Sequence, residues 1–224
     1  MFESSLAHGS ALWDLGYAKL PALLSPVECC QIRDLYAQPE LFRSRIDMKR
    51  FRFGQGEYQY FDYPLPVAIA SLRSRLYQSL VPIANQWQCG EFPARHSDFL
   101  QSCADAAQIR PTPLILRYRA GDYNCLHQDL YGKVFFPFQV IIGLSAPGEE
   151  FTGGELLLVE QQPRAQSVAR VVPMAQGDGA VIATRYRVAR NARGGTYRAN
   201  IRHGVSTVHT GERFTLGIIF HDAE

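Results

Sequence analysis

The first half of the chain carries apolar residues at helical spacing. Ile69, Leu72, Leu76, Leu80 and Ile83 recur between residues 66 and 87, which predicts an amphipathic helix. A proline at position 82 kinks this helix or starts a second segment. Ahead of it, Ser25-Pro26-Val27-Glu28 combines a capping serine, a first-turn proline and a capping-box glutamate. The elements expected here are a strand over 16–21 and helices over 25–37, 66–87 and 97–107.

From residue 114 onward the apolar pattern changes to a period of two. In 213–220, alternate residues place arginine, threonine, glycine and isoleucine on one face and four large apolar side chains on the other. Short strands separated by Gly and Pro turns predict a sandwich or barrel, and a double-sheet jelly roll has a mouth that holds a metal and a ligand. Strands are expected over 114–119, 134–145, 155–160, 168–172, 180–184, 201–208 and 213–220.

The two halves together predict an α+β fold, mostly β with flanking helices. We expect a jelly-roll core over 113–224 and a mainly helical part over 1–112 packed on it. Because helices and barrel would share one core, 1–224 is interpreted as a single domain. The Gly153-Gly154 pair is interpreted as a tight turn that allows a close backbone approach.

Composition adds limits on compartment and partners. Apolar residues make up 46% and charged residues 20% of the chain, and the net charge of +2 neither requires nor excludes a polyanionic partner. The five cysteines are odd in number and lack a Cys-x-x-Cys pair, which argues against a disulfide framework or a zinc cluster. No signal-peptide pattern and no run of about 18 apolar residues is present. We therefore expect a cytoplasmic protein without a membrane span.

The stretch His127-Gln128-Asp129 carries the main candidate chemistry. Residues i and i+2 of an extended segment point the same way, so His127 and Asp129 can reach one ion together. With His203 they offer two imidazoles and one carboxylate, a set that suits non-haem Fe(II) and leaves positions open for a cosubstrate and O2. In isolation, a His-x-Asp pair is more often a surface pair, and a single histidine is more often structural. His209 and His221 are interpreted as structural, and His8 and His96 are distant in sequence and carry no motif.

Arg213 lies ten residues after His203, inside the apolar strand 213–220. A buried arginine is costly unless it is paired, and its planar guanidinium matches a carboxylate in two parallel hydrogen bonds. Thr215, two residues on, can add a hydroxyl to the same carboxylate. The alternative for Arg213 alone is an ordinary ion pair.

Three stretches together resemble the Fe(II)- and 2-oxoglutarate-dependent dioxygenases of the prolyl-hydroxylase-like group. They are Tyr118-x-x-Gly121-x5-His127-x-Asp129, Phe151-x-Gly153-Gly154-Glu155-Leu156 and His203-x9-Arg213-x-Thr215. The resemblance implies a double-stranded β-helix, Fe(II) held by His127, Asp129 and His203, and 2-oxoglutarate held by Arg213 with Tyr118 and Thr215. The segment 203–222 is also similar to a bacterial family of oxygenases that act on damaged nucleic acid.

The implied activity is hydroxylation of a C–H bond with O2 and 2-oxoglutarate as cosubstrates. Three functions stay open: oxidation of nucleic acid such as oxidative demethylation, hydroxylation of a protein side chain or small molecule, and a non-catalytic metal-binding jelly roll. A buried carboxylate clamp at Arg213 argues against the third. The well-known alkylation-repair oxygenases carry a second arginine six residues after the clamp, where this chain has Ile219.

Two segments concentrate positive charge. Residues 41–63 interleave basic and aromatic side chains, a composition that can follow a phosphate backbone and stack bases, and residues 185–200 are rich in Arg and Gly. The alternatives are a solvated strand-loop element and a flexible loop. As a hypothesis, single-stranded nucleic acid crosses the barrel mouth between the two segments. The basic residues expected to contact it are Arg43, Arg45, Lys49, Arg50, Arg52, Arg187, Arg190, Arg193 and Arg198.

Overall fold

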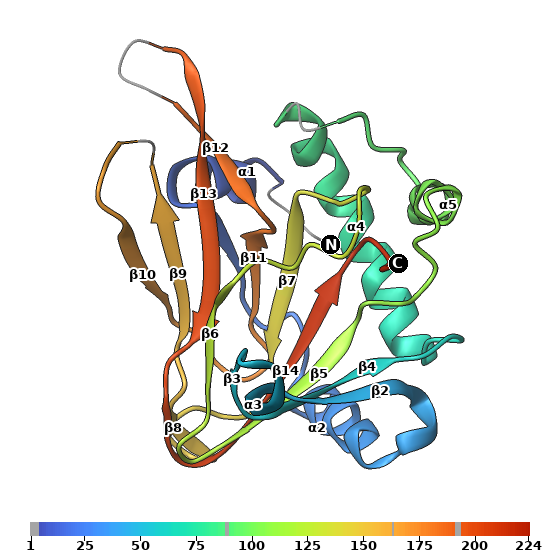
Figure 1. Ribbon diagram of the computed structural model, residues 1–224, viewed down its shortest axis with the longest axis vertical. Helices are drawn as coiled ribbons and strands as arrows, with labels where there is room; N and C mark the ends of the chain where they lie inside the picture. Colours follow the sequence, from blue (N-terminus) through green and yellow to red (C-terminus); the bar gives the residue numbers. More distant parts are fainter. Residues whose placement is uncertain (1–4, 88–89, 163, 191–193) are drawn as a thin grey trace.

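A computed structural model of the chain describes residues 5–87, 90–162, 164–190 and 194–224. Two antiparallel sheets face each other, and α4 (Val67–Gln86) and α5 (His96–Asp105) cover the side of the larger sheet that faces away from the smaller one (Figure 1). This arrangement confirms the predicted jelly roll with flanking helices. The remaining helices are α1 (Ser5–Leu15), α2 (Pro26–Asp34) and α3 (Met48–Phe51), with 3-10 turns at Leu35–Ala37 and Pro39–Leu41.

The larger sheet is built around the long strand β14. Its order is β1 (Tyr17–Leu20), β11 (Gly179–Ala183), β7 (Phe138–Gly143), β14 (Val208–Ile219), β5 (Leu114–Arg119), β4 (Glu57–Phe61) and β2 (Phe42–Asp47). The short strand β8 (Phe151–Gly153) pairs with the first part of β14. Apart from β2 and β4, the strands that follow one another in this order are far apart in sequence, as in a jelly roll.

The smaller sheet has the order β10 (Val168–Val172), β9 (Leu156–Gln161), β13 (Thr196–Val205), β6 (Tyr123–His127) and β3 (Gly54–Gln55). The strand β12 (Tyr186–Arg190) pairs with the first part of β13. Because β3 belongs to this sheet and β2 and β4 to the larger one, the basic-aromatic segment 41–63 bridges the two sheets at one side of the barrel.

Alternation along β14 sorts its side chains as the sequence predicts. Leu216, Ile218 and Phe220 lie in one hydrophobic core with the apolar stripe of α4, and all three are fully buried. Helix α4 runs through Pro82 as one helix rather than as two segments. Ser25 and Glu28 form the expected capping box at the start of α2. The opposite face of β14 is left to line the space between the sheets.

Three expectations about elements were wrong. The strand predicted over 134–145 is limited to β7, since the hydrogen-bonded ladder with β11 and β14 begins at Phe138. Helix α1 was not expected; its buried Leu12 and the edge-to-face contact of Trp13 with Trp87, 5.9 Å between ring centroids, fix it on the rest of the chain.

No described helix has the length and apolar character needed to cross a bilayer.

The third correction concerns 185–200, which was predicted to be a loop. Most of it forms β12 and the first part of β13. Arg187 is buried rather than exposed, and its guanidinium makes two hydrogen bonds to the Glu160 carboxylate at 2.9 and 2.8 Å. The arginine content that indicated a solvated loop therefore includes a paired core residue. Residues 191–193 lie outside the described residues.

Candidate metal centre and cosubstrate pocket

His127 and His203 face each other across two neighbouring strands of the smaller sheet. His203 on β13 pairs in register with His127 at the end of β6, and the register shifts immediately afterwards. At this point the strands approach closely, since a Cβ at Gly204 would lie 2.7 Å from the Asn124 carbonyl oxygen. The two imidazole rings end up 4.2 Å apart between centroids.

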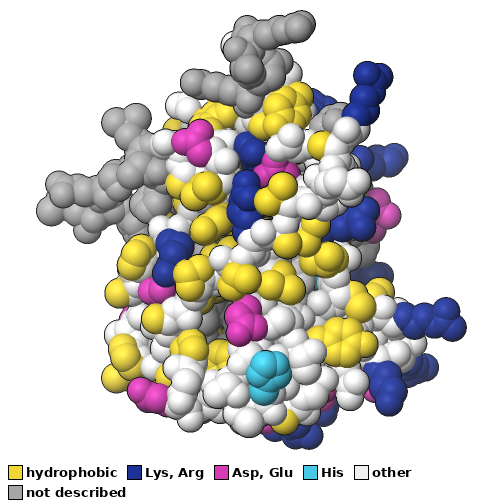
Figure 2. All heavy atoms as spheres, turned by 90° about the vertical axis from the view of Figure 1, so that its left-hand side faces the viewer, with side chains coloured by type: hydrophobic (Ala, Val, Ile, Leu, Met, Phe, Trp, Pro, Cys, Tyr) yellow, Lys and Arg dark blue, Asp and Glu magenta, His cyan; other side chains and the backbone are white. Residues whose placement is uncertain are grey.

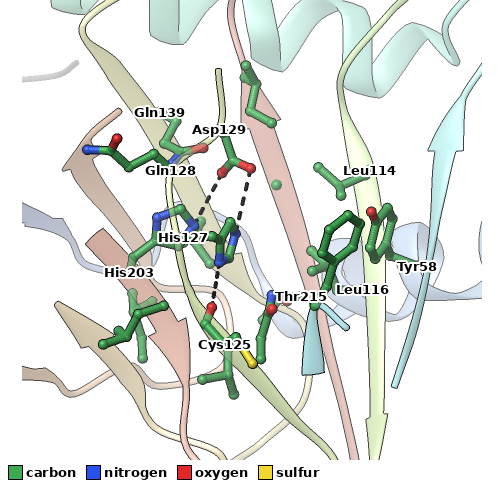
Figure 3. A pocket seen from close by; sticks show the side chains of 18 of the residues that line it. Tyr58, Leu114, Leu116, Cys125, His127, Gln128, Asp129, Gln139, His203 and Thr215 are labelled. Atoms are coloured by element: carbon green, nitrogen blue, oxygen red, sulfur yellow. Dashed lines mark hydrogen bonds and ion pairs between the residues drawn. The ribbon is translucent and has the colours of Figure 1, made fainter. Parts of the chain in front are cut away.

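Asp129 completes a cluster of three ligand side chains. Its Oδ2 lies 3.2 Å from His203 Nε2, and its Oδ1 lies 3.6 Å from His127 Nε2 (Figure 3). The three ligand atoms all lie within 4.8 Å of one another. Two imidazole nitrogens and a carboxylate oxygen at this spacing fit a divalent metal bound on one face. The geometry therefore brings together the three residues that the sequence predicts to meet.

The protonation states of this cluster suit a metal. The His127 Nδ1–H donates to the Cys125 carbonyl oxygen at 2.7 Å, which leaves Nε2 as the free acceptor. Burial, together with the neighbouring His203, lowers the pKa of His127, so the ring is neutral near pH 7. Burial alone would raise the pKa of Asp129, but its contacts with His203, His127 and Tyr131 outweigh that effect and hold the pKa below its ordinary value.

Arg213 lies in the same space, on the inward face of β14. It is 4% exposed, and its Nη1 has no hydrogen-bond partner within the described part of the chain. Its guanidinium carbon sits 5.3 Å from the centre of the Tyr118 ring and 6.0 Å from that of Phe151. A buried, unpaired guanidinium is costly, so the site fits an anionic group that satisfies it. Burial also lowers the pKa of Arg213.

Tyr118 and Thr215 flank this arginine. Tyr118 is fully buried directly across from Arg213 in the β5–β14 ladder, and its hydroxyl accepts a hydrogen bond from Asn124 Nδ2 at 3.3 Å. Thr215 lies two residues along β14 on the same face and is 3% exposed. The three side chains expected from the sequence to hold one carboxylate are therefore gathered around one point.

Gly154 provides the room for the arginine side chain. Its φ of +64° is a left-handed conformation, and a Cβ at this position would lie 2.9 Å from the Arg213 Cδ. The close approach predicted for Gly153-Gly154 is thus made, at Gly154, against the side chains of Val208 at 2.8 Å and Arg213. An alanine at 154 would push the clamp side chain as well as strain the turn.

One cavity of about 310 Å³ connects these groups. It holds the three ligand residues, Arg213, Tyr118 and Thr215, and its size is at the lower end for a small-molecule site. Apolar side chains from both sheets and from the α3–β3 turn cover much of its wall. They include Phe53, Leu114, Leu116, Leu126, Ile141, Leu156, Val205 and Ile219. Cys125, which is exposed, also lines it.

Sequence reasoning missed three polar side chains of this cavity. Tyr131 donates from its hydroxyl to Asp129 Oδ1 at 2.7 Å, and Tyr60 donates to the Tyr131 hydroxyl at 2.9 Å. Gln139 is 2% exposed, and its Nε2 has no hydrogen-bond partner among the described residues. The i, i+2 relation between Asp129 and Tyr131 was a usable signal. Tyr60 and Gln139 come from distant strands and gave none.

The structure gives several predicted nucleic-acid contacts an internal partner. Arg43 donates to the Pro111 carbonyl oxygen at 3.0 Å and stacks on the Tyr60 ring at 4.5 Å. Arg45 pairs with Glu57, and Arg198 stacks on the Tyr186 ring at 4.6 Å. Arg43 and Arg45 thus have partners within the barrel, although the Arg45 side chain is 63% exposed, and contact of the first basic segment with nucleic acid stays a prediction.

Lys49, Arg50 and Arg52 are exposed on and after α3, and Arg52 reaches the cavity. Arg52 caps α3 in a left-handed conformation with a φ of +59° and lines the cavity beside Phe53. The Phe51 and Phe53 rings stack 5.7 Å apart, and each residue is 48% exposed. This small surface, Lys49 to Phe53, combines charge and exposed aromatic rings next to the opening.

Comparison with known proteins places the chain in a family. The model of a family named Oxygenase-NA, described as an oxygenase catalysing oxidative methylation of damaged DNA, matches residues 56–223. The chain belongs to this family. The matched region of this Oxygenase-NA member contains every candidate ligand and clamp residue described above. The resemblance seen in the sequence is thereby confirmed at the level of the family.

A relative of this Oxygenase-NA member is known from Mycobacterium tuberculosis. The Uncharacterized protein Rv2227 of strain H37Rv is 47% identical over 168 residues, which cover 73% of this chain and 72% of the relative. A protein of strain CDC 1551, the Uncharacterized protein MT2286, matches equally.

Solved structures with the same fold include a prolyl-4-hydroxylase and an oxidoreductase. A prolyl-4-hydroxylase of Pseudomonas putida aligns with a TM-score of 0.60 at 15% identity, covering 99% of this chain and 100% of its own. An oxidoreductase of the 2OG-Fe(II) oxygenase family from Burkholderia pseudomallei aligns with a TM-score of 0.59 at 19% identity, covering 100% and 94%. The family makes the protein an oxygenase, its fold is that of these two structures, and its cluster of two histidines and one carboxylate could hold a metal ion.

Proposed function

We propose that the protein hydroxylates a C–H bond of nucleic acid in an Fe(II)- and 2-oxoglutarate-dependent reaction. The observation that carries the proposal is the buried Arg213 guanidinium with an unpaired Nη1, in one cavity with His127, Asp129 and His203. A purely structural metal site has no use for such an arginine. A site that chelates a 2-oxo acid and clamps its far carboxylate uses both features.

Each side chain has a separate task in this proposal. The Nε2 atoms of the two histidines and the Asp129 carboxylate would hold Fe(II), and Arg213 with Thr215 would hold the 2-oxoglutarate carboxylate remote from the metal. When bound, iron with 2-oxoglutarate and O2 supplies the oxidising power that inserts oxygen into a C–H bond. The apolar wall of the cavity excludes water from the reacting atoms.

The surface from Lys49 to Phe53 supports nucleic acid as the substrate. Cationic side chains neutralise phosphates, and exposed rings stack on unpaired bases for about 1–3 kcal/mol each. Figure 2 shows the molecule from the side of the smaller sheet, with Lys and Arg side chains along one edge of that face and hydrophobic side chains over its middle. The family description, oxidation of damaged DNA, supports the same substrate class.

This site departs from that of the alkylation-repair oxygenases at Ile219, and its gap between His203 and Arg213 is also shorter. At the position of their second arginine, this chain has Ile219, which is 1% exposed and packs with Tyr60 and Leu114. The wall of the cavity is therefore apolar there. The proposal extends to oxidation of nucleic acid, and oxidative demethylation is the case in which a hydroxylated N-methyl group leaves as formaldehyde.

The reaction is tested by succinate release from 2-oxoglutarate with Fe(II), against methylated single-stranded oligonucleotides, peptides and small metabolites in parallel. Stimulation by oligonucleotides, with formaldehyde formed in proportion for N-methylated ones, supports the proposal. If only peptides or metabolites stimulate succinate release, the substrate belongs to one of those classes and is not nucleic acid. Absence of succinate release under every condition contradicts the enzymatic proposal itself.

The binding surface is tested separately by a salt titration with a labelled single-stranded oligonucleotide. Arg50→Gln with Arg52→Gln should reduce the slope of log affinity against log salt by roughly 0.7 for each lost contact. The matched control is Arg75→Gln with Arg110→Gln, which removes the same charge from exposed residues outside the cavity. Equal slopes in both double variants would exclude this surface.

A further inference from the structure

The two oxygens of the Asp129 carboxylate have different surroundings. Oδ2 lies toward His203, 3.2 Å from its Nε2. Oδ1 accepts the hydrogen bond of the Tyr131 hydroxyl at 2.7 Å and lies farther, 3.6 Å, from the other histidine. One oxygen is therefore committed to a protein donor while the other is available.

The orientation of the Tyr131 hydroxyl is fixed by a hydrogen bond from Tyr60. Tyr60 donates to the Tyr131 oxygen at 2.9 Å, and a hydroxyl that accepts there turns its only proton elsewhere. The acceptor in reach is Asp129 Oδ1. The Tyr60 ring is itself held by the Arg43 guanidinium stacked on it at 4.5 Å, and Arg43 is tied to the Pro111 carbonyl oxygen. This series of contacts connects a backbone carbonyl group to a candidate metal ligand.

The number of carboxylate oxygens on a metal decides how many positions remain. With two histidines and one oxygen, an octahedral ion keeps three positions, enough for a chelating 2-oxo acid and O2. If both oxygens bind, only two remain. Donation of a hydrogen bond to one oxygen occupies a lone pair that the metal would otherwise take, as groups around metal ligands commonly do.

We propose that Tyr131 is a positioning residue that keeps Asp129 bound to the metal through one oxygen, with Tyr60 aiming the Tyr131 hydroxyl. The proposal rests on the ligand assignment made under the proposed function. It also gives Arg43 a role in the metal centre, in place of the phosphate contact expected from the sequence. Neither tyrosine touches the metal or the reacting atoms in this proposal.

The test uses Co(II) in the full chain, with Tyr131→Phe, Tyr60→Phe and the control Tyr77→Phe. Tyr77→Phe also removes a buried hydroxyl. In the unmodified chain this hydroxyl donates to the Pro93 carbonyl oxygen at 2.9 Å in the helical layer. Visible absorption of Co(II) reports its coordination, and calorimetry gives the affinities for Co(II) and then for 2-oxoglutarate. Urea unfolding reports how much stability each variant loses.

Tyr131→Phe should weaken Co(II) binding by about 10–100-fold, change the Co(II) spectrum, and weaken 2-oxoglutarate binding to the Co(II) form. Tyr60→Phe should change the Co(II) affinity, the Co(II) spectrum and the 2-oxoglutarate affinity in the same direction but by a smaller amount. It tests the proposal even if Tyr131→Phe fails to fold. Tyr77→Phe should leave spectrum and affinities as in the unmodified chain. An unchanged spectrum and Co(II) affinity in folded Tyr131→Phe, or in Tyr60→Phe if Tyr131→Phe does not fold, would overturn the proposal.

His203→Ala separates this failure from failure of the ligand assignment. If His203→Ala loses Co(II) binding while Tyr131→Phe and Tyr60→Phe behave as the unmodified chain, the site is correct and only the positioning role is wrong. If His203→Ala binds Co(II) normally, the assignment of the metal ligands is wrong and the positioning role falls with it.

Discussion

His127 and His203 stand opposite each other in the β6–β13 ladder, with ring centroids 4.2 Å apart. Burial, and next to it the repulsion from His203, lowers the pKa of His127. His127, His203 and Asp129 would hold a metal ion, whose positive charge the Asp129 carboxylate and the two imidazole nitrogens would stabilise. Strand pairing, rather than a loop, thus sets the spacing of two ligands that are far apart in sequence.

Replacing any one of the three ligands should remove tight metal binding. His203→Ala leaves a nitrogen and a carboxylate, and we expect the affinity for Fe(II) under anaerobic conditions to fall by well over the roughly 100-fold upper range seen for residues around metal ligands. His209→Ala is the matched control, since His209 is exposed and belongs to no ligand cluster among the described residues. Retained iron in purified His203→Ala, by metal analysis, would refute the assignment.

Arg213→Ala should weaken 2-oxoglutarate binding by about 2–5 kcal/mol, the range for truncating one partner of a buried charge pair. Metal binding should stay nearly unchanged, because Arg213 lies outside the ligand cluster. Arg202→Ala serves as the control, since Arg202 precedes His203 on the exposed side of β13. Equal 2-oxoglutarate affinity in the two variants, measured by calorimetry with the metal present, would show that Arg213 is not the clamp.

Gly154→Ala should impair the same clamp without touching a polar group. A side chain at this left-handed position costs about 1–2 kcal/mol of stability, and its Cβ would also press on the Arg213 stem. Gly148 has a φ of +84°, and a Cβ added there would have no atom within 4 Å, so Gly148→Ala carries the backbone cost alone. Gly154→Ala should lose at least as much stability in urea as Gly148→Ala, and only Gly154→Ala should bind 2-oxoglutarate more weakly. Similar binding in both would mean that Arg213 moves aside freely.

His96 should make the fold sensitive to mild acid. Burial, with the nearby Arg73 charge, lowers its pKa from 6.5 to about 4, and its Nε2–H donates to the Phe220 carbonyl oxygen at 2.8 Å. Between pH 6.5 and 4 the unfolded chain takes up a proton that the folded chain refuses, so stability falls as pH falls through this window. At about 1.4 kcal/mol per pKa unit, the loss approaches roughly 3 kcal/mol. Above pH 6.5 the residue contributes no pH dependence.

His96→Gln keeps a side-chain N–H donor and cannot titrate. The free energy of unfolding should therefore fall less steeply in this variant than in the unmodified chain when urea melts at pH 7, 6 and 5 are compared. Parallel curves for the two proteins would show that His96 is protonated as easily in the folded state as in the unfolded one.

The sequence predicted the parts of the site that lie on regular strands. Alternation along 213–220 placed Arg213 and Thr215 on the inward face, and that face lines the cavity. The i, i+2 spacing of His127 and Asp129 brought both to one point. These inferences worked because each depends on the local period of the backbone and on no distant partner.

What the sequence could not predict depends on pairing between distant segments. Arg187 looked like a loop cation because its partner Glu160 lies on another strand. Arg43 looked like a phosphate ligand because its two partners, the Tyr60 ring and the Pro111 carbonyl oxygen, are distant in sequence. Composition cannot separate an arginine held by the barrel from one that is free to bind a ligand.

The exposed surface at the mouth and the metal-bearing strand share one hydrogen-bonded ladder. Gly54 of β3 pairs with Asn124 of β6, and the Cys125 N–H donates to the Phe53 carbonyl oxygen at 2.8 Å. The backbone that presents Phe53 outward is therefore continuous with the one that ends at His127. Thermodynamic linkage makes any coupling across it reciprocal: a ligand at the mouth that orders β3 and raises metal affinity must itself bind more tightly, by the same factor, once the metal is in place.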